Sequence, residues 1–325
     1  MGIYAQATYE ILPRTRLTMG GRFTYEDKQE SGSQTLLAAG GPISVTPAPS
    51  PGLGIPSSID FKRFNYRVAL DHKFTPDILG YLSFNTGFKS GGYVLASPTV
   101  QPYAPESIKA AEIGLKTQLF DRRVRLNLAG FYYDYKNIQV QRFSAGTIVI
   151  YNGAKAELYG VDLDGEVAIA RGLTINGGLS YIHDRFKSFP NADFIIPIEG
   201  CVPAPGGVCQ GSAAGNKLPF TPTVSLNVGG DYKIETDVGT LGLNATYFWS
   251  SRFYAAPDNV LSQPAYDLVN ASVSWTSVDG HVTIRLWGKN LGGTVYATSL
   301  LEGFSGGVRS LGSPRTYGMT AGFTF

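Results

Sequence analysis

Few residues of this sequence have the types and spacing that catalysis needs. Residues 303–307 (GFSGG) match the G-x-S-x-G pattern of a nucleophilic serine, but that serine works on a turn from a strand into a helix. Here the pattern falls in a loop between two expected strands. The three histidines, His72, His183 and His281, stand in separate segments, and no H-E-x-x-H pattern is present for zinc. We therefore expect no enzyme, no metal site and no cofactor.

Two further pairs of residues each have two interpretations. Asp162 and Asp164 are spaced to share one face of a strand, where a salt-bridge network is a simpler role for them than acid–base catalysis. Cys201 and Cys209 lie in a segment rich in Pro and Gly, and two cysteines are too few for a zinc site. We predict a disulfide between them if this segment faces an oxidising space, with two free thiols as the alternative.

Composition limits the partners. Only 16% of the 325 residues are charged, and 27 basic residues nearly balance 25 acidic ones. No basic block is present that could follow a nucleic-acid backbone, so nucleic acid is not expected as a partner. Prolines interrupt the longest uncharged stretch, residues 34–59, which predicts a loop and not a transmembrane helix. No secretory signal opens the chain, so we expect a fragment of a longer protein.

Residues alternate between apolar and polar along most of the chain, which is typical of strands. Residues 16–26 put Leu, Met, Phe and Tyr on one face and Arg, Thr and Glu on the other, and residues 223–234 repeat the division. We expect about thirteen strands, near residues 2–11, 16–27, 61–74, 79–88, 108–120, 124–141, 148–169, 173–187, 222–234, 241–255, 265–276, 281–298 and 308–325. After Leu128 aromatic residues occupy both faces, which predicts a bulge or inward-facing rings there.

The connections between these segments alternate in kind. Tight turns join the segments at one end, and long loops over residues 27–60, 89–107 and 188–221 join them at the other. Aromatic residues gather near both ends of the apolar face, and Phe64 to Phe74 span about 25 Å once a strand tilt of about 40° is included. The polar face is too rich in hydrogen-bonding groups for a dry core, and the apolar face is too large to meet water. The sequence therefore predicts an all-β protein, an antiparallel transmembrane β-barrel.

Four stretches carry a resemblance to a known family. They are Gly87–Tyr93 with Pro105–Glu106 and the E-x-G-x-K of Glu112–Lys116, Asn127–Gln139, Asn152–Asp162, and finally Lys289–Leu291 with Pro314–Phe325. In this order they resemble the barrel of the TonB-dependent outer-membrane receptors. Asp162 stands where the family more often has Glu, and the terminal Phe325 is similar to the signal read by the outer-membrane assembly machinery.

The resemblance implies a place in a larger molecule. Members of this family have a barrel of about 22 strands behind a plug domain and a motif that binds the energy-coupling protein TonB. Residues 1–325 would then be the C-terminal portion of the barrel, without the plug and the first strands. The expected function is TonB-energised uptake of a scarce nutrient, most often a ferric siderophore, across the outer membrane of a Gram-negative cell. A passive diffusion porin is the alternative, and a plug upstream would distinguish the two.

Five residues near the long loops are candidates for binding the ligand. They are Arg22, Phe88, Tyr93, Arg252 and Tyr254. We expect all of them to face inward, where guanidinium and aromatic groups suit anionic, catechol-bearing or planar chelates. The alternative role for each is in the aromatic girdle or in loop packing.

Overall fold

The structure, a computed structural model, consists of strands and the connections between them. It describes residues 1–38, 41–48, 52, 54–94, 101–144, 147–194, 209–303 and 306–325. Within these residues, no helix is long and apolar enough to cross a membrane.

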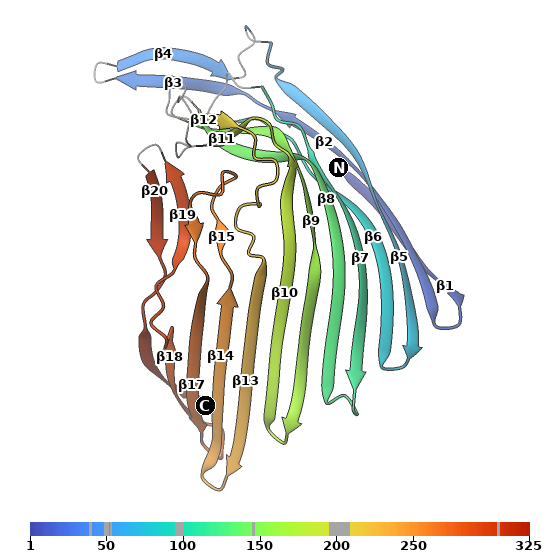
Figure 1. Cartoon of the computed structure of the whole chain (residues 1–325), viewed down its shortest axis with the longest axis vertical. Coiled ribbons are helices and arrows are strands. Elements are labelled where there is room, and N and C mark those ends of the chain that lie inside the picture. Colours follow the sequence, from blue (N-terminus) through green and yellow to red (C-terminus); the bar gives the residue numbers. More distant parts are fainter. Residues whose placement is uncertain are drawn as a thin grey trace.

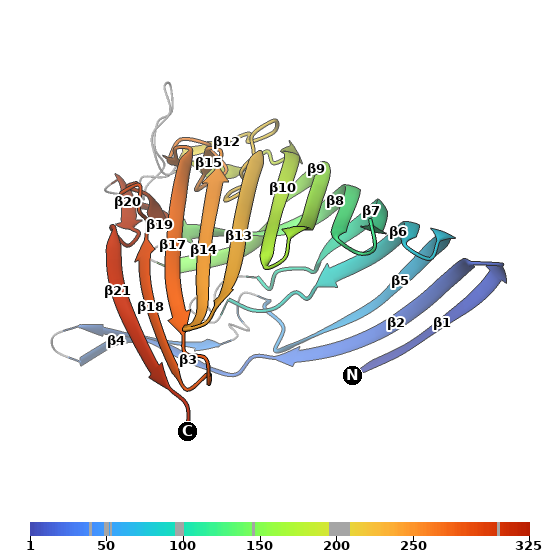
Figure 2. The same cartoon turned by 90° about the horizontal axis from the view of Figure 1, so that it is seen from below.

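Thirteen strands form one antiparallel sheet. In sheet order they are β1 (Gly2–Leu12), β2 (Thr15–Gln29), β5 (Ser58–Thr75), β6 (Ile78–Lys89), β7 (Glu106–Leu119), β8 (Val124–Ser144), β9 (Thr147–Ala170), β10 (Leu173–Ser188), β13 (Val224–Thr236), β14 (Gly239–Ser250), β17 (Tyr266–Thr276), β18 (Val282–Lys289) and β21 (Thr316–Phe323). Each strand pairs with the strands that come before and after it in the sheet's chain order, so the sheet is a meander. It curves into a trough whose free edges are β1 and β21 (Figure 2).

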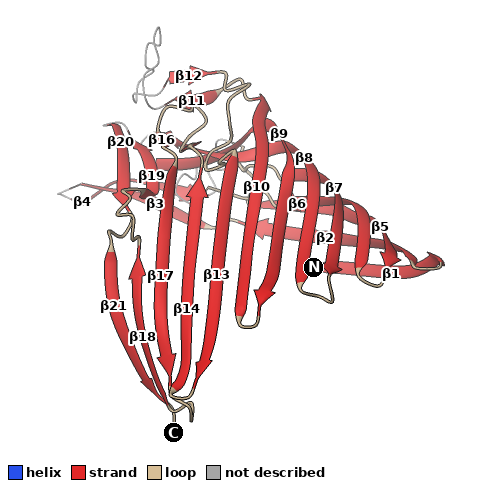
Figure 3. Ribbon diagram, turned by 60° about the horizontal axis from the view of Figure 1, so that its bottom comes forward, coloured by secondary structure: helices blue, strands red, loops and turns tan. Residues whose placement is uncertain are grey.

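Tight turns connect these strands at one end of the sheet, and the longer connections gather at the other end (Figures 1 and 3). The prediction of alternating turns and loops is confirmed. We call the end of the sheet with the longer connections the long-loop end. Four hairpins stand there, formed by β3 (Gly32–Ala38) with β4 (Gly41–Ala48), β11 (Ala192–Phe194) with β12 (Cys209–Gly211), β15 (Phe253–Tyr254) with β16 (Ser262–Gln263), and β19 (Ala297–Gly303) with β20 (Gly306–Leu311).

The register places one kind of side chain on each face of the sheet. Leu70, Leu82, Ile113, Gly130 and Val161 stand opposite one another from β5 to β9 and form one row of the apolar face. Ile113 remains 63% exposed in this row and Leu82 54% exposed. Such a broad exposed apolar surface is typical of a sheet that meets lipid and not water.

Several sequence predictions of element boundaries were wrong: the expected loop over residues 188–221 contains β11 and β12, and the strand expected over 241–255 ends at Ser250. The expected loop over residues 27–60 contains the β3–β4 hairpin. The strand expected over 281–298 ends at Lys289, because Asn290 turns the backbone to a φ of 49°. The strand expected over 308–325 is two strands, β20 and β21, with a break at 312–315 that contains Gly312 and Pro314.

The bulge expected after Leu128 is present near the long-loop end of β8. The pairing of β8 with β9 shifts between Tyr135 and Ile138, and Asn137 has a φ of 55°. Before the shift, Phe131 and Tyr133 stack on the polar face with ring centroids 4.9 Å apart. The bulge and the inward-facing rings therefore occur together.

Buried apolar side chains are concentrated at the long-loop end and not in the middle of the sheet. The larger cluster is made by Ala154, Ala156, Phe186, Phe189, Ala192, Phe194, Cys209 and Ala213. A smaller one joins Leu261, Ala297 and Leu300. These clusters fix the loops on the ends of the strands.

Candidate functional site

Cross-strand pairs cover the middle of the polar face. Asn127 Nδ2 donates a hydrogen bond to Asp164 Oδ2 at 2.9 Å, and Ser180 Oγ donates one to Asp162 Oδ1 at 2.5 Å. Partners that stand opposite each other on antiparallel strands are close enough for such bonds. Asp162 and Asp164 are therefore members of a hydrogen-bonding network, which is the simpler of their two interpretations.

A shallow hollow of about 300 Å³ opens where β1, β2, β5 and β6 run side by side. Its lining includes Tyr4, Gln6, Arg22, Asn65, Arg67, Asn85 and Thr86. Arg22 stands opposite Asn65, and Arg67 stands opposite Asn85. Arg22 Nε donates to Thr24 Oγ1 at 3.2 Å, and neither arginine forms an ion pair with another described residue. The two guanidinium groups are therefore available to an anion.

Three of the other predicted ligand residues lie among the loops of the long-loop end. The Tyr93 hydroxyl donates to the carbonyl oxygen of Pro56 at 2.9 Å, so it ties two loops together. Tyr254 lies in β15 and pairs with Ser262, and the exposed Arg252 precedes it. Seven strands separate β2, which carries Arg22, from β14 in the sheet order. The structure therefore does not bring Arg22 into one group with Arg252 and Tyr254 along the sheet.

Phe88 is on the face opposite to the one expected. It stands opposite Ser107 of β7. Phe84 lies four residues before it on the same strand and stacks on Tyr66 with ring centroids 5.9 Å apart. Phe84 stands opposite Val68, a member of the apolar face. Since side chains two residues apart share a face, Phe88 belongs to the apolar face.

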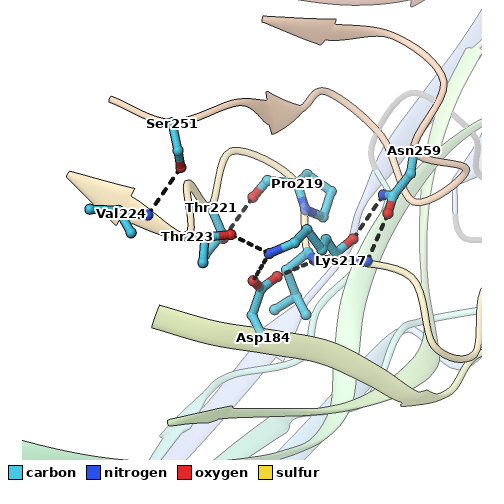
Figure 4. A network of polar contacts seen from close by, with 9 residues as sticks. Asp184, Lys217, Pro219, Thr221, Thr223, Val224, Ser251 and Asn259 are labelled. Atoms are coloured by element: carbon cyan, nitrogen blue, oxygen red, sulfur yellow. Dashed lines mark hydrogen bonds and ion pairs between the residues drawn. The ribbon is translucent and has the colours of Figure 1, made fainter. Parts of the chain in front are cut away.

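An ion pair that the sequence did not predict anchors the long connection between β10 and β13. Asp184 of β10 has a side chain with no exposed surface. Lys217 Nζ lies 3.2 Å from its Oδ1, and the Leu218 backbone N–H donates to its Oδ2 at 2.5 Å (Figure 4). Lys217 Nζ also donates to Thr223 Oγ1 at 2.7 Å. The Asn259 side chain completes the network through two hydrogen bonds to the Lys217 backbone.

Two carboxyl groups meet between the β15–β16 turn and the β19–β20 hairpin. Asp258 and Glu302 contact each other, and no other described residue donates to Asp258 Oδ2 or Glu302 Oε1, both of which are buried. Burial, together with the Asp258 charge, raises the pKa of Glu302 to about 7. Burial also raises the pKa of Asp258. The pair therefore holds a proton under conditions in which exposed carboxyls have lost theirs.

The described residues cover the remaining candidate groups only in part. Within the described ranges, no group of three or more His, Cys, Asp or Glu side chains could hold a metal ion. Cys209 is buried at the start of β12, and Cys201 lies outside the described residues, so the disulfide stays a prediction. Phe304 and Ser305 of the G-x-S-x-G pattern also lie outside the described residues.

Comparison with known proteins decides the family. Residues 1–291 match the model of the TonB dependent receptor-like β-barrel. The chain belongs to this family of outer-membrane receptors. It therefore resides in the outer membrane of a Gram-negative bacterium, with the apolar face toward lipid and the polar face lining the lumen.

The relatives are much longer than the chain. The pesticin receptor of Yersinia enterocolitica is 24% identical over 264 residues, which are 80% of this chain and 36% of the receptor. The catecholate siderophore receptor Fiu of Escherichia coli K12 is 25% identical over 227 residues, 69% of this chain and 26% of the receptor. The solved structure of the ferric yersiniabactin uptake receptor FyuA from Yersinia pestis has a TM-score of 0.80 at 20% identity and covers all of this chain, which covers 45% of FyuA. The fold is therefore that of part of such a barrel.

Proposed function

We propose that this chain is the C-terminal portion of the barrel of a receptor that imports a ferric siderophore with energy passed through TonB. The plug domain and about nine further strands would come from the part of the receptor that precedes it. The sheet supports this proposal because no described strand pairs with the outer edge of β1 or of β21, and an open edge within lipid is too costly to persist. The proposal implies a transporter that performs no catalysis of its own.

The hollow around Arg22 and Arg67 is the observation that supports an anionic ligand. A ferric siderophore with catecholate or carboxylate donors carries negative charge on its oxygen atoms, and guanidinium groups bind such oxygens through pairs of hydrogen bonds. Tyr93, Arg252 and Tyr254 would meet the ligand first, because they lie among the loops through which it enters. Phe88 is not part of this proposal, since it faces lipid.

Ligand binding to the complete receptor tests the proposal. Replacing both arginines (Arg22→Gln and Arg67→Gln) is expected to weaken the binding of an anionic ferric siderophore about tenfold to a hundredfold. Arg171→Gln is the matched control, because Arg171 is 93% exposed in a tight turn at the other end of the sheet. Affinity is measured by the quenching of intrinsic fluorescence, together with growth on the siderophore under iron limitation. Unchanged binding in the double variant would remove the hollow from the ligand path. Growth that persists without TonB would favour the passive porin.

A further inference from the structure

A band of charged side chains crosses the lipid-facing side of the sheet close to the long-loop end. Lys109, Asp134, Glu157 and Arg185 stand opposite one another on β7, β8, β9 and β10. Lys155 is on the same side because it lies two residues from Glu157 on β9, and ion pairs with Asp134 and Glu157 put Lys136 and Lys187 there too. We call the five cations, Lys109, Lys136, Lys155, Arg185 and Lys187, the basic patch. They face away from the lumen, so they cannot take part in the import path.

The height of the basic patch follows from the row of aromatic residues beside it. Tyr132, Tyr159 and His183 stand opposite one another two residues closer to the middle of the strands, and Tyr159 stacks on His183 with ring centroids 4.7 Å apart. Tyrosines on the outside of a barrel mark the boundary between hydrocarbon and headgroups. Two residues along a tilted strand are about 5 Å in height. The patch is therefore at the level of the lipid headgroups.

The acidic residues of the band hold the cations in place and leave a positive excess. Glu157 lies 2.6 Å from the Arg185 guanidinium and 3.5 Å from Lys187 Nζ. Asp134 lies 3.6 Å from Lys187 Nζ and 3.8 Å from Lys136 Nζ. The carboxylates of Glu157 and Asp134 are mostly covered, with side-chain exposures of 9% and 21%. The three cations that pair with them are between 43% and 54% exposed. Five cations and two anions leave three positive charges presented outward.

The excess does not extend to β2 and β5. Near the long-loop end, the lipid-facing side of these two strands carries Lys62, which lies 3.5 Å from Asp60 and 5.6 Å from the centre of the Tyr25 ring. Asp27 is on the same side, so this stretch has no positive excess. The aromatic row alone therefore does not explain the five cations.

We propose that the basic patch on β7 to β10 binds the phosphate groups of a phosphorylated lipid in the outer leaflet of the membrane. The phosphates would lie between the exposed ammonium and guanidinium groups, and the acyl chains would lie against Tyr132, Tyr159 and the apolar rows below them. The proposal depends on the membrane location of the barrel and not on the ligand that the receptor imports. A lipid held at this place would fix the outer ends of four strands beneath the long loops.

Lipid binding by the full-length receptor in nanodiscs of zwitterionic lipid tests the proposal. Bis-phosphorylated lipid A is titrated in, and the lipid retained per receptor is measured by native mass spectrometry. The variant with Lys109→Gln and Lys155→Gln leaves every ion pair of Glu157 and Asp134 in place, and we expect it to weaken retention about tenfold. Lys62→Gln is the matched control on the lipid-facing side of β5 and is expected to change retention less than twofold.

The amount of lipid A retained per receptor supports or overturns the proposal. Loss of retention in the double variant, together with weak retention of lipid A that lacks phosphates, supports it. Retention that is unchanged in the double variant, or equal for lipid A with and without phosphates, overturns it. Competition by inorganic phosphate at the same concentration as lipid A would show a free-phosphate site instead, and would also overturn it. Heat-modifiable migration in gels confirms that each variant is folded.

Discussion

At the scale of single residues, the Asp258 and Glu302 pair gives the outer loops a dependence on pH. The pKa of Glu302 is raised from 4.5 to about 7 by burial and by Asp258. A carboxyl with a raised pKa stabilises the folded contact fully below its unfolded pKa, and this contribution is lost as the pH rises through the folded pKa. The contact between the β15–β16 turn and the β19–β20 hairpin should therefore weaken as the pH rises from about 4.5 to about 7.

Tryptic cleavage at the exposed Arg309 of β20 measures this effect. The wild-type receptor should be cleaved faster relative to the Glu302→Gln variant as the pH rises from about 5 to about 8. The glutamine amide is neutral at every pH and can donate to Asp258, so the variant keeps the contact closed. A ratio of cleavage rates that stays constant over this range would show that the pair does not control the hairpin.

The Asp184 network predicts a loss of stability that is specific to one carboxylate. Asp184→Ala leaves Lys217 Nζ and the Leu218 N–H without their acceptor, which should lower the free energy of unfolding by about 2 kcal/mol. Asp184→Asn should cost less, because its amide oxygen can still accept from Leu218. Asp237→Ala, at an exposed position in a tight turn, is the control and should have almost no effect. Urea unfolding of the receptor in detergent measures all three, and equal midpoints for Asp184→Ala and Asp237→Ala would contradict the prediction.

The sequence predicts which face a residue takes better than it predicts the residue's contacts. Strict alternation places Arg22 on the polar face, and the same rule applied from Phe84 would have placed Phe88 on the apolar face. The partnership of Asp184 with Lys217 has no such signal. The two residues are 33 positions apart across a long loop, and the closure of that loop depends on packing that no local pattern encodes.

At the scale of elements, the tight turns carry backbone requirements that can be tested in pairs. Gly172 and Gly280 both have φ values near the left-handed region, 78° and 75°. A Cβ at Gly172 would come 2.2 Å from the Lys233 carbonyl oxygen, whereas a Cβ at Gly280 meets nothing within 4 Å. Gly280→Ala should therefore cost about 1 kcal/mol of folding free energy from backbone strain alone, and Gly172→Ala should cost at least about 2 kcal/mol. The urea midpoints of the two variants measure the two costs. Equal costs would mean that the β9–β10 turn, which contains Gly172, moves away from Lys233 without strain.

Strand existence could be predicted from the sequence, and strand ends could not. Period-two alternation identified all thirteen strands of the main sheet, because a two-faced environment acts on every residue of a strand. The ends of β18 and β21 depend on the backbone at Asn290 and at 312–315, where local turn geometry overrides the apolar pattern. The hairpins of the long loops were missed because their short strands lack a sustained alternation.

At the scale of the whole molecule, stability depends on lipid at one face of the sheet and on water at the other. The buried clusters lie at the long-loop end, so the middle of the sheet has no apolar core of its own within the described residues. Lipid takes the place of that core on one face, while hydrogen-bonded pairs such as Asn127 with Asp164 serve the hydrated lumen on the other. The folding free energy lost when a charge is introduced should therefore depend on which face of the sheet carries it, and not only on its depth in the membrane.

Two lysines introduced at adjacent positions of the sheet test this division. Ile113→Lys puts a charge on the lipid-facing side near mid-height, where Ile113 is 63% exposed, and should cost about 2–4 kcal/mol of folding free energy. Ala129→Lys is the matched variant on the lumen side, since Ala129 stands opposite Gly114 and Asp162. It should cost less than about 1 kcal/mol, because the lysine reaches water and a carboxylate. Folding into vesicles under urea titration measures both. A lumen variant as unstable as the lipid-facing one would mean that the polar face is not hydrated, and the barrel orientation would have to be reversed or abandoned.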